Sequence, residues 1–216
     1  MHTALDLPPP YTPIALREAG DAFAHACAVA AAQGAGTLVW VRRFDLVECA
    51  VVFEPEEVLA TARQVLFAGM NAAADALAAI APPEKPLVLD WPDAIRFDSG
   101  LIGGGRLGWP TDCAEGVRPD WLVFGLMLRA ALTREPQPGA VPPAALIDEG
   151  FEDFEVPDFI ASFARHLMVA LDEWASVGPQ SQPARWRQRG RWRDGDLALA
   201  LRAPSWLDPA TGEPIA

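Results

Sequence analysis

The residues whose types and spacing could perform chemistry are gathered between positions 87 and 110. Trp91-Pro92-Asp93 follows an apolar run, and the consecutive glycines Gly103, Gly104 and Gly105 interrupt a later one. Glycines in a strand let another group approach the main chain closely and leave amide N–H groups available as donors. The stretch therefore predicts one wall of a ligand site. A β-bulge or a tight corner, which also uses glycine, is the alternative.

Three arginines are the candidate charged groups of this site. Arg106 follows the glycines directly, and Arg42 and Arg43 end an earlier predicted strand. Guanidinium groups bind carboxylates and phosphates through paired donors. Surface ion pairing, in a chain with 29 acidic residues, is the competing interpretation. The glycine run does not match the glycine-rich phosphate loops, which need a different spacing before a helix.

A second charged pattern lies near the C-terminus. Five arginines alternate with other residues at positions 185, 187, 189, 191 and 193, and Trp186 and Trp192 have the opposite parity. In a strand this spacing gives one basic and one aromatic face, a combination that binds single-stranded nucleic acid. The formal charge of the chain is −12, however. We therefore expect the arginines of this stretch to bind acidic side chains of the protein itself, and we predict no nucleic-acid partner.

The elements that must position these residues follow from the hydrophobic pattern. An alanine-rich helix is predicted within residues 20–36, with Asp21 as N-cap and Gly34 as stop. Strands are predicted at 37–44 and 47–55, joined as a tight hairpin, and at 86–91, 94–97, 101–109 and 120–132. Amphipathic helices are predicted at 54–81, with Glu56 and Glu57 in the first turn, and at 156–178. A proline-rich loop precedes the second of them. This order predicts an α+β fold with a mixed or antiparallel sheet and packed helices.

Length and composition limit the class of protein. The 216 residues suffice for one substantial core, and we predict one domain at 1–190 with a small extension or arm at 191–216. The arm is expected to be β-rich or extended. No apolar run reaches the length of a membrane span, and the start lacks the pattern of a secretory signal. Three widely spaced cysteines and scattered histidines favour a cytoplasmic protein without a metal site.

Two quoted segments resemble a known family. "LDWPDAI" followed by "LIGGGRLG" is similar to the biotin ligase signature K-W-P-N-D-I and its following K-(I/V/L)-(A/G)-G strand. "GAGTLVWVRR", "VECAVVFEPEE" and "WLVFGLMLRAAL" also fall in the family order, so the resemblance to the biotin/lipoate protein ligase superfamily covers about residues 12–190. It implies an α+β fold with a ligand cleft, adenylation of biotin or a lipoyl-type acid with ATP, and transfer to a lysine of a carrier domain. A related branch transfers an octanoyl group through a cysteine thioester.

The sequence departs from this pattern at the charged positions. Asp90 stands where the first motif lysine is expected, Leu101 where the second is expected, and Arg129 where the family has an asparagine. The arginine- and glycine-rich loop between the first two family strands is missing, because residues 43–46 join them directly. No cysteine follows the Arg129 strand. Lys85 is the only lysine, and we expect it on the surface.

These observations predict a divergent family member that binds a small carboxylic or acyl ligand and has lost adenylation, because a carboxylate replaces a cation that the reaction needs. The predicted cleft residues are Trp91, Pro92, Asp93, Gly103, Gly104, Gly105, Arg106, Arg42 and Arg43. One alternative is an active biotin, lipoate or octanoate ligase or acyltransferase in which arginines replace the lysines. A second is a non-catalytic scaffold. The ligand, the protein partner and homo-oligomer formation stay open.

Overall fold

A computed structural model describes residues 5–133 and 143–215. Its centre is an eight-stranded mixed sheet in the order β1-β2-β3-β7-β6-β5-β4-β8. Only the two outer pairs, β1 with β2 and β4 with β8, are parallel. The strands are β1 (Thr12–Leu16), β2 (Thr37–Val41), β3 (Leu46–Phe53), β4 (Leu87–Asp90), β5 (Ala94–Phe97), β6 (Gly100–Gly108), β7 (Leu122–Arg129) and β8 (Gly190–Arg191). The predicted α+β class, mixed sheet and hairpin between β2 and β3 are confirmed.

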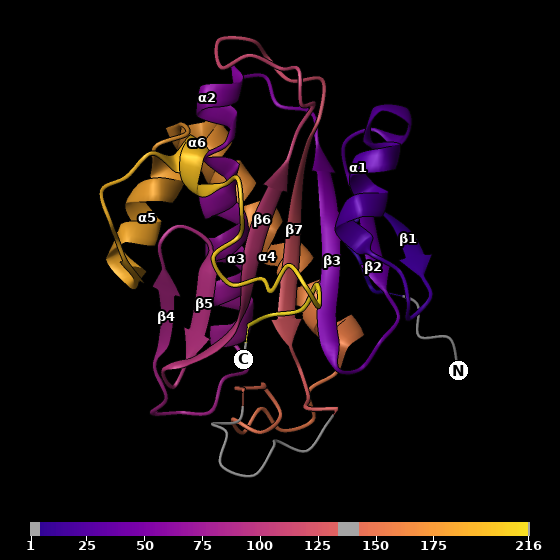
Figure 1. The fold of residues 1–216 in the computed structure, drawn as a ribbon, viewed down its shortest axis with the longest axis vertical. Coiled ribbons are helices and arrows are strands. Elements are labelled where there is room, and N and C mark those ends of the chain that lie inside the picture. Colours follow the sequence, from indigo (N-terminus) through magenta and orange to yellow (C-terminus); the bar gives the residue numbers. More distant parts are fainter. Residues whose placement is uncertain (1–4, 134–142, 216) are drawn as a thin grey trace.

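The helices cover the two faces of the sheet unequally. They are α1 (Ala22–Gln33), α2 (Leu59–Ala62), α3 (Val65–Ala78), α4 (Val156–Val177), α5 (Ser181–Arg189) and α6 (Leu197–Ala200). Figure 1 shows α3 and α4 behind the sheet, whereas α1 lies in front of it. We call these the α4 face and the α1 face. The main apolar core lies on the α4 face, and a smaller cluster of alanines and valines lies under α1.

The ends of α1 and α4 follow the predicted signals. The Asp21 side chain accepts a hydrogen bond from the amide of Ala24 at 2.9 Å, and the helix ends at Gly34 in a left-handed conformation with φ of 77°. Helix α4 ends at Gly178, with φ of 110°. Glycine suits both ends, because side chains rarely adopt these backbone angles.

The predicted helix at 54–81 is corrected by the structure. Residues 54–58 are not helical, and Glu56 and Glu57 lie before the first turn rather than in it. The helix begins at Leu59, whose amide donates to the carbonyl of Val117, and a break follows at Arg63. The Arg63 guanidinium is buried and pairs with Glu115 at 2.5 Å. Contacts with the loop at 115–117, which the local pattern does not encode, set this boundary.

The predicted arginine and tryptophan strand is also corrected. Residues 181–189 form α5, and only Gly190 and Arg191 form a strand. Gln, Ala and Arg favour a helix until Gly190 ends it. Trp186 is fully buried, and its ring contacts those of Phe67 and Trp192 at 5.7 Å. The two tryptophans therefore belong to one aromatic core cluster instead of an exposed face.

The arginines of this stretch bind the acidic body, as the sequence predicts. Arg185 and Arg189 pair with Asp75 at 2.8 and 2.6 Å, and Arg191 pairs with Asp90 at 3.6 Å. Residues 134–142, which belong to the predicted proline-rich loop, lie outside the described residues. In the part of the chain that is described, no helix is long and apolar enough to cross a bilayer.

Candidate functional site

The glycine strand is covered by the end of the chain. After α6, residues 201–215 run across β6, β7 and β3 on the α1 face, as Figure 1 shows in yellow. We call this segment the C-terminal strap. The predicted arm at 191–216 thus has little regular structure beyond β8, α6 and one bridge between Leu207 and Pro214, and it lies on the body of the domain.

Trp206 attaches the strap to the glycine strand. Its side chain is fully buried among Leu46, Ala94 and Met127. The indole Nε1 donates a hydrogen bond to the carbonyl oxygen of Gly105 at 2.8 Å. A Cβ atom on Gly104 would lie 2.4 Å from the Trp206 ring and 2.0 Å from the carbonyl oxygen of Asp93. Gly104 is therefore required by the chain's own close packing.

The other two glycines also face protein atoms. A Cβ atom on Gly103, whose φ is 144°, would meet the Met127 carbonyl oxygen at 2.0 Å. On Gly105 it would point to the α4 face and meet Phe124 at 2.8 Å. The pairing of β5 with β6 shifts register beside Gly103, as expected of the bulge alternative.

The Trp-Pro turn reaches both the glycine strand and the strap. The peptide bond between Trp91 and Pro92 is cis. The Asp93 carbonyl oxygen accepts from the Gly105 amide at 2.8 Å, and its buried carboxylate accepts from the Ser205 hydroxyl at 2.5 Å and the Ser205 amide at 3.1 Å. Burial raises the pKa of Asp93 to about 6, although the two Ser205 hydrogen bonds oppose this shift. The Trp91 ring contacts that of Trp192 instead of the strap, at 6.3 Å.

The three predicted arginines have different partners. Arg43 forms a bidentate pair with Asp45 at 2.6 and 2.8 Å and reaches Glu213 of the strap at 3.4 Å. Arg106 pairs with Asp21 at 3.2 Å and lies 4.1 Å from the centre of the Phe23 ring, at the start of α1. Arg42 is exposed beyond the end of β2. Arg43 thus contacts the strap that covers the glycine strand, whereas Arg106 contacts the start of α1.

Arg129 is a further charged residue of the α1 face, and the sequence pattern does not identify it as a site residue. It lies at the end of β7 and is buried, with 7% of its surface exposed. Its guanidinium donates to the carbonyl oxygens of Ala144, at 3.1 Å, and of Pro214 and Ile215 in the strap. Among the described residues, no carboxylate forms an ion pair with it. Burial lowers its pKa from the ordinary value.

The two positions at which the family has lysine are Asp90 and Leu101 in this chain, and neither side chain is positively charged. Asp90 binds Arg96 at 2.6 Å, and Leu101 packs beside the Trp206 cluster. Lys85 pairs with Glu149 at 2.7 Å and Asp98 at 3.6 Å. No group of three or more His, Cys, Asp or Glu side chains that could hold a metal ion occurs among residues 5–133 and 143–215.

The comparisons with known proteins decide the family. The model of the biotin/lipoate A/B protein ligase family matches residues 7–188. The chain belongs to this family. A search of curated protein sequences finds no match. A biotin protein ligase-like protein of unknown function from Silicibacter sp. TM1040 is 32% identical, with a TM-score of 0.77 over 87% of this chain and 81% of that chain.

More distant family members share the fold alone. The apo biotin protein ligase of Aquifex aeolicus is 13% identical, with a TM-score of 0.67 over 84% of this chain and 79% of that chain. The Leishmania major biotin protein ligase in complex with biotinyl-5-AMP is 16% identical, with a TM-score of 0.58 over 94% of this chain and 88% of that chain.

The α1 face beside the glycines is filled by the protein's own side chains in the conformation described. The wall at Gly104 is occupied by Trp206, and the arginines Arg43 and Arg106 are paired with carboxylates. This biotin/lipoate ligase family member retains the fold of its relatives, and its own C-terminal strap covers the glycines of β6.

Proposed function

We propose that the protein is a non-adenylating member of its family that binds a small carboxylic acid on the α1 face. The bound acid displaces contacts that the C-terminal strap makes in the conformation described. Arg129 is the cation of the proposed site, and Gly104 forms part of its wall. The ligands of the related biotin protein ligases, biotin and biotinyl-5-AMP, carry the same acyl chemistry.

The observation that carries this proposal is the set of partners around Arg129. A buried guanidinium normally pairs with a carboxylate, because taking the charge out of water is costly. Among the residues that the structure describes, its acceptors are neutral carbonyl oxygens, and two of them belong to the strap. A bidentate carboxylate is a stronger acceptor than a carbonyl, so an acid can replace the strap at this position.

The surrounding contacts support a strap that can be exchanged. The strap is held by a few polar contacts, to Asp93, Gly105, Arg129 and Arg43, and by the buried side chains of Trp206 and Leu201, with Leu207 partly buried. A cavity of about 420 Å³ lies beside Arg129, between β3, β7 and residues 208–214. Asp45, Asp208 and Glu213 also line it, and Arg43 pairs with the first and last of these carboxylates. When Trp206 leaves, the space beside Gly104 becomes available to an acyl chain.

Calorimetric titration at pH 7 tests the proposal. Octanoate, lipoate and biotin are titrated with and without ATP and Mg²⁺, and pyrophosphate exchange is measured in parallel. We expect at least one acid to bind without ATP, at least tenfold more weakly to Arg129→Gln, and no pyrophosphate exchange. Arg165→Gln, which changes an exposed arginine of α4, is the matched control. ATP-dependent exchange, or no binding of any of the acids, would contradict the proposal.

A further inference from the structure

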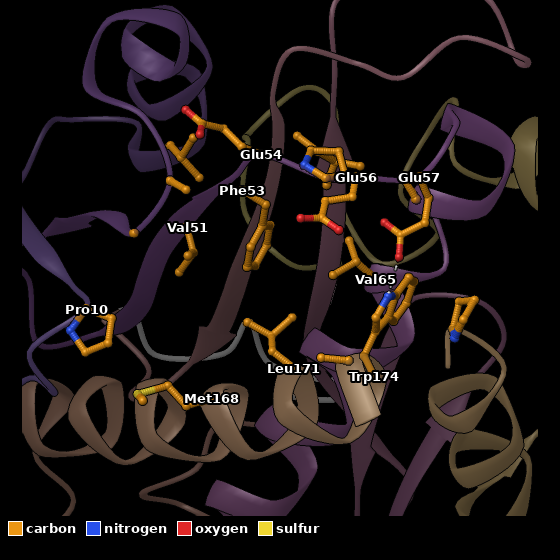
Figure 2. Close-up of a pocket in the computed structure, with 18 of the residues that line it drawn as sticks. Pro10, Val51, Phe53, Glu54, Glu56, Glu57, Val65, Met168, Leu171 and Trp174 are labelled. Carbon is orange, nitrogen blue, oxygen red and sulfur yellow. Dashed lines mark hydrogen bonds between the residues drawn. The ribbon is translucent and has the colours of Figure 1, made fainter. Parts of the chain in front are cut away.

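A second cavity lies on the α4 face, away from the glycine strand. It has a volume of about 690 Å³, which is in the range of small-molecule sites. The end of β3, helix α4, residues 54–57 and the segment before β1 enclose it (Figure 2). Neither the strap nor the residues around Arg129 line it. It is therefore independent of the carboxylic-acid site proposed above.

The inner lining of this cavity is apolar. Val51 and Phe53 of β3 face Met168, Leu171 and Trp174 of α4 in Figure 2. Phe53, Met168, Leu171 and Trp174 are only partly buried, so their apolar surface is available to a ligand. Burying such surface is favourable by roughly 25 cal/mol per Å². The cavity thus suits a hydrocarbon chain or an aromatic body.

One rim of the cavity is acidic, and none of its described lining residues is basic. Glu54, Glu56 and Glu57 follow one another around Pro55 at the exit of β3. In Figure 2 the Glu56 and Glu57 carboxylates point toward Leu171 and Trp174, whereas that of Glu54 points away. The Trp174 Nε1 donates to Glu57 Oε1 at 2.7 Å, which fixes one carboxylate beside the indole ring. No Lys, Arg or His among the lining residues neutralises these charges.

This combination selects a ligand by charge. A carboxylate or phosphate would meet the Glu56 and Glu57 carboxylates at the rim, with no cation among the described lining residues to offset them. An ammonium group would meet those carboxylates and the face of an aromatic ring, which attracts cations. We infer that the cavity binds a hydrophobic amine, with its apolar body between β3 and α4 and its ammonium group beside Glu56, Glu57 and Trp174.

The experiment uses two probes that differ only in the charged group. Octylammonium, protonated at pH 7 as lysine is, and octanoate have the same chain length. The full chain is titrated with each by calorimetry, and the Trp174 indole N–H is followed by ¹⁵N NMR. We expect octylammonium to bind and shift the Trp174 signal, and octanoate to leave this signal unchanged. An equal shift with octanoate would overturn the inference.

Variants separate this cavity from the α1 face. Leu171→Trp fills the cavity and should weaken octylammonium binding at least tenfold. The double change Glu56→Gln and Glu57→Gln keeps a hydrogen-bond acceptor for Trp174. It should weaken octylammonium binding about fivefold, because it removes both rim charges. Asp172→Asn, an exposed neighbour on α4, is the charge control and should have no effect. Arg129→Gln should leave octylammonium binding unchanged, even if the carboxylic-acid site fails. Octylammonium binding that survives both Leu171→Trp and the double change would overturn the inference.

Discussion

The Trp206 indole donates a hydrogen bond to the Gly105 carbonyl oxygen at 2.8 Å, so a side chain near the C-terminus is bonded to the glycine strand of β6. The neighbouring Gly104 has no room for a Cβ atom because this indole and the Asp93 carbonyl oxygen occupy the space. The close approach that glycine permits at this position is made here by the protein itself.

Trp206→Ala should destabilise the protein by about 3–4 kcal/mol, because it removes a fully buried aromatic side chain and leaves a cavity. Urea unfolding measures this loss. Leu199→Ala, at a side chain with 61% of its surface exposed, is the control and should change the free energy of unfolding by less than about 0.5 kcal/mol. A Trp206→Ala loss as small as that of the control would mean that the strap is not packed on β6.

Asp93 should make the stability of the fold fall as pH rises from about 4 to about 6. Burial raises its pKa in the native state from 3.8 to about 6, so the native state holds this proton more tightly than the unfolded chain. Deprotonation therefore costs native-state stability, on the order of 2–3 kcal/mol in total. Below pH 4 both states are protonated at this group, and above pH 7 neither is.

Asp93→Asn isolates this contribution. The readout is the pH slope of the free energy of unfolding, since the amide also changes the hydrogen bonds to Ser205. We expect the wild-type curve to fall relative to the Asp93→Asn curve between pH 4 and 6.5. Parallel curves would show that Asp93 does not titrate in this range.

Arg129→Gln should loosen the strap as well as remove the proposed carboxylate partner. The change leaves carbonyl oxygens of Ala144, Pro214 and Ile215 without their donor, and we expect a loss of about 2 kcal/mol in unfolding free energy. Arg129→Lys keeps the charge but not the paired donors. Compared with Arg129→Gln, Arg129→Lys should recover part of the free energy of unfolding and little of the affinity for the acid. Full acid affinity in the lysine variant would contradict bidentate recognition.

The arginine-rich stretch should not bind nucleic acid. Arg185, Arg189 and Arg191 are paired with Asp75 and Asp90, and the chain as a whole is acidic. Fluorescence polarisation with a labelled thymidine oligonucleotide should show no binding at about 150 mM salt. The double variant Asp75→Asn and Asp90→Asn, which removes the carboxylates nearest to these arginines, should gain weak, salt-sensitive binding. Binding by the wild-type chain would contradict the pairing described.

Sequence patterns predict most of the sheet and the capped helices of this fold, because local signals define them. Alternating and β-branched runs mark β2, β3 and β5 to β7, and Asp21, Gly34 and Gly178 mark helix ends. Long-range contacts decide the failures. Helix α2 begins only where residues 115–117 supply its first acceptors, and α5 buries Trp186 against Phe67 of α3.

The site itself is harder to predict from the sequence. Gly103 to Gly105 and the Trp-Pro turn are visible as motifs, but a motif does not tell what approaches its glycines. The answer depends on Ser205 and Trp206, about 100 residues later, in a turn-rich segment without periodicity. Arg129 is visible only as a departure from the family asparagine, and its hydrogen bonds to carbonyl oxygens of the strap depend on a segment about 85 residues later.

The central claim, that a carboxylic acid competes with the strap for the α1 face, is tested most directly by hydrogen exchange of the strap amides. The Ser205 amide donates to Asp93 at 3.1 Å, and the Ile215 amide donates to the Trp206 carbonyl oxygen at 2.8 Å. Exchange is measured with and without a saturating acid identified by calorimetry. We predict that the acid accelerates exchange at both amides. Unchanged or slower exchange at both would contradict displacement of the strap.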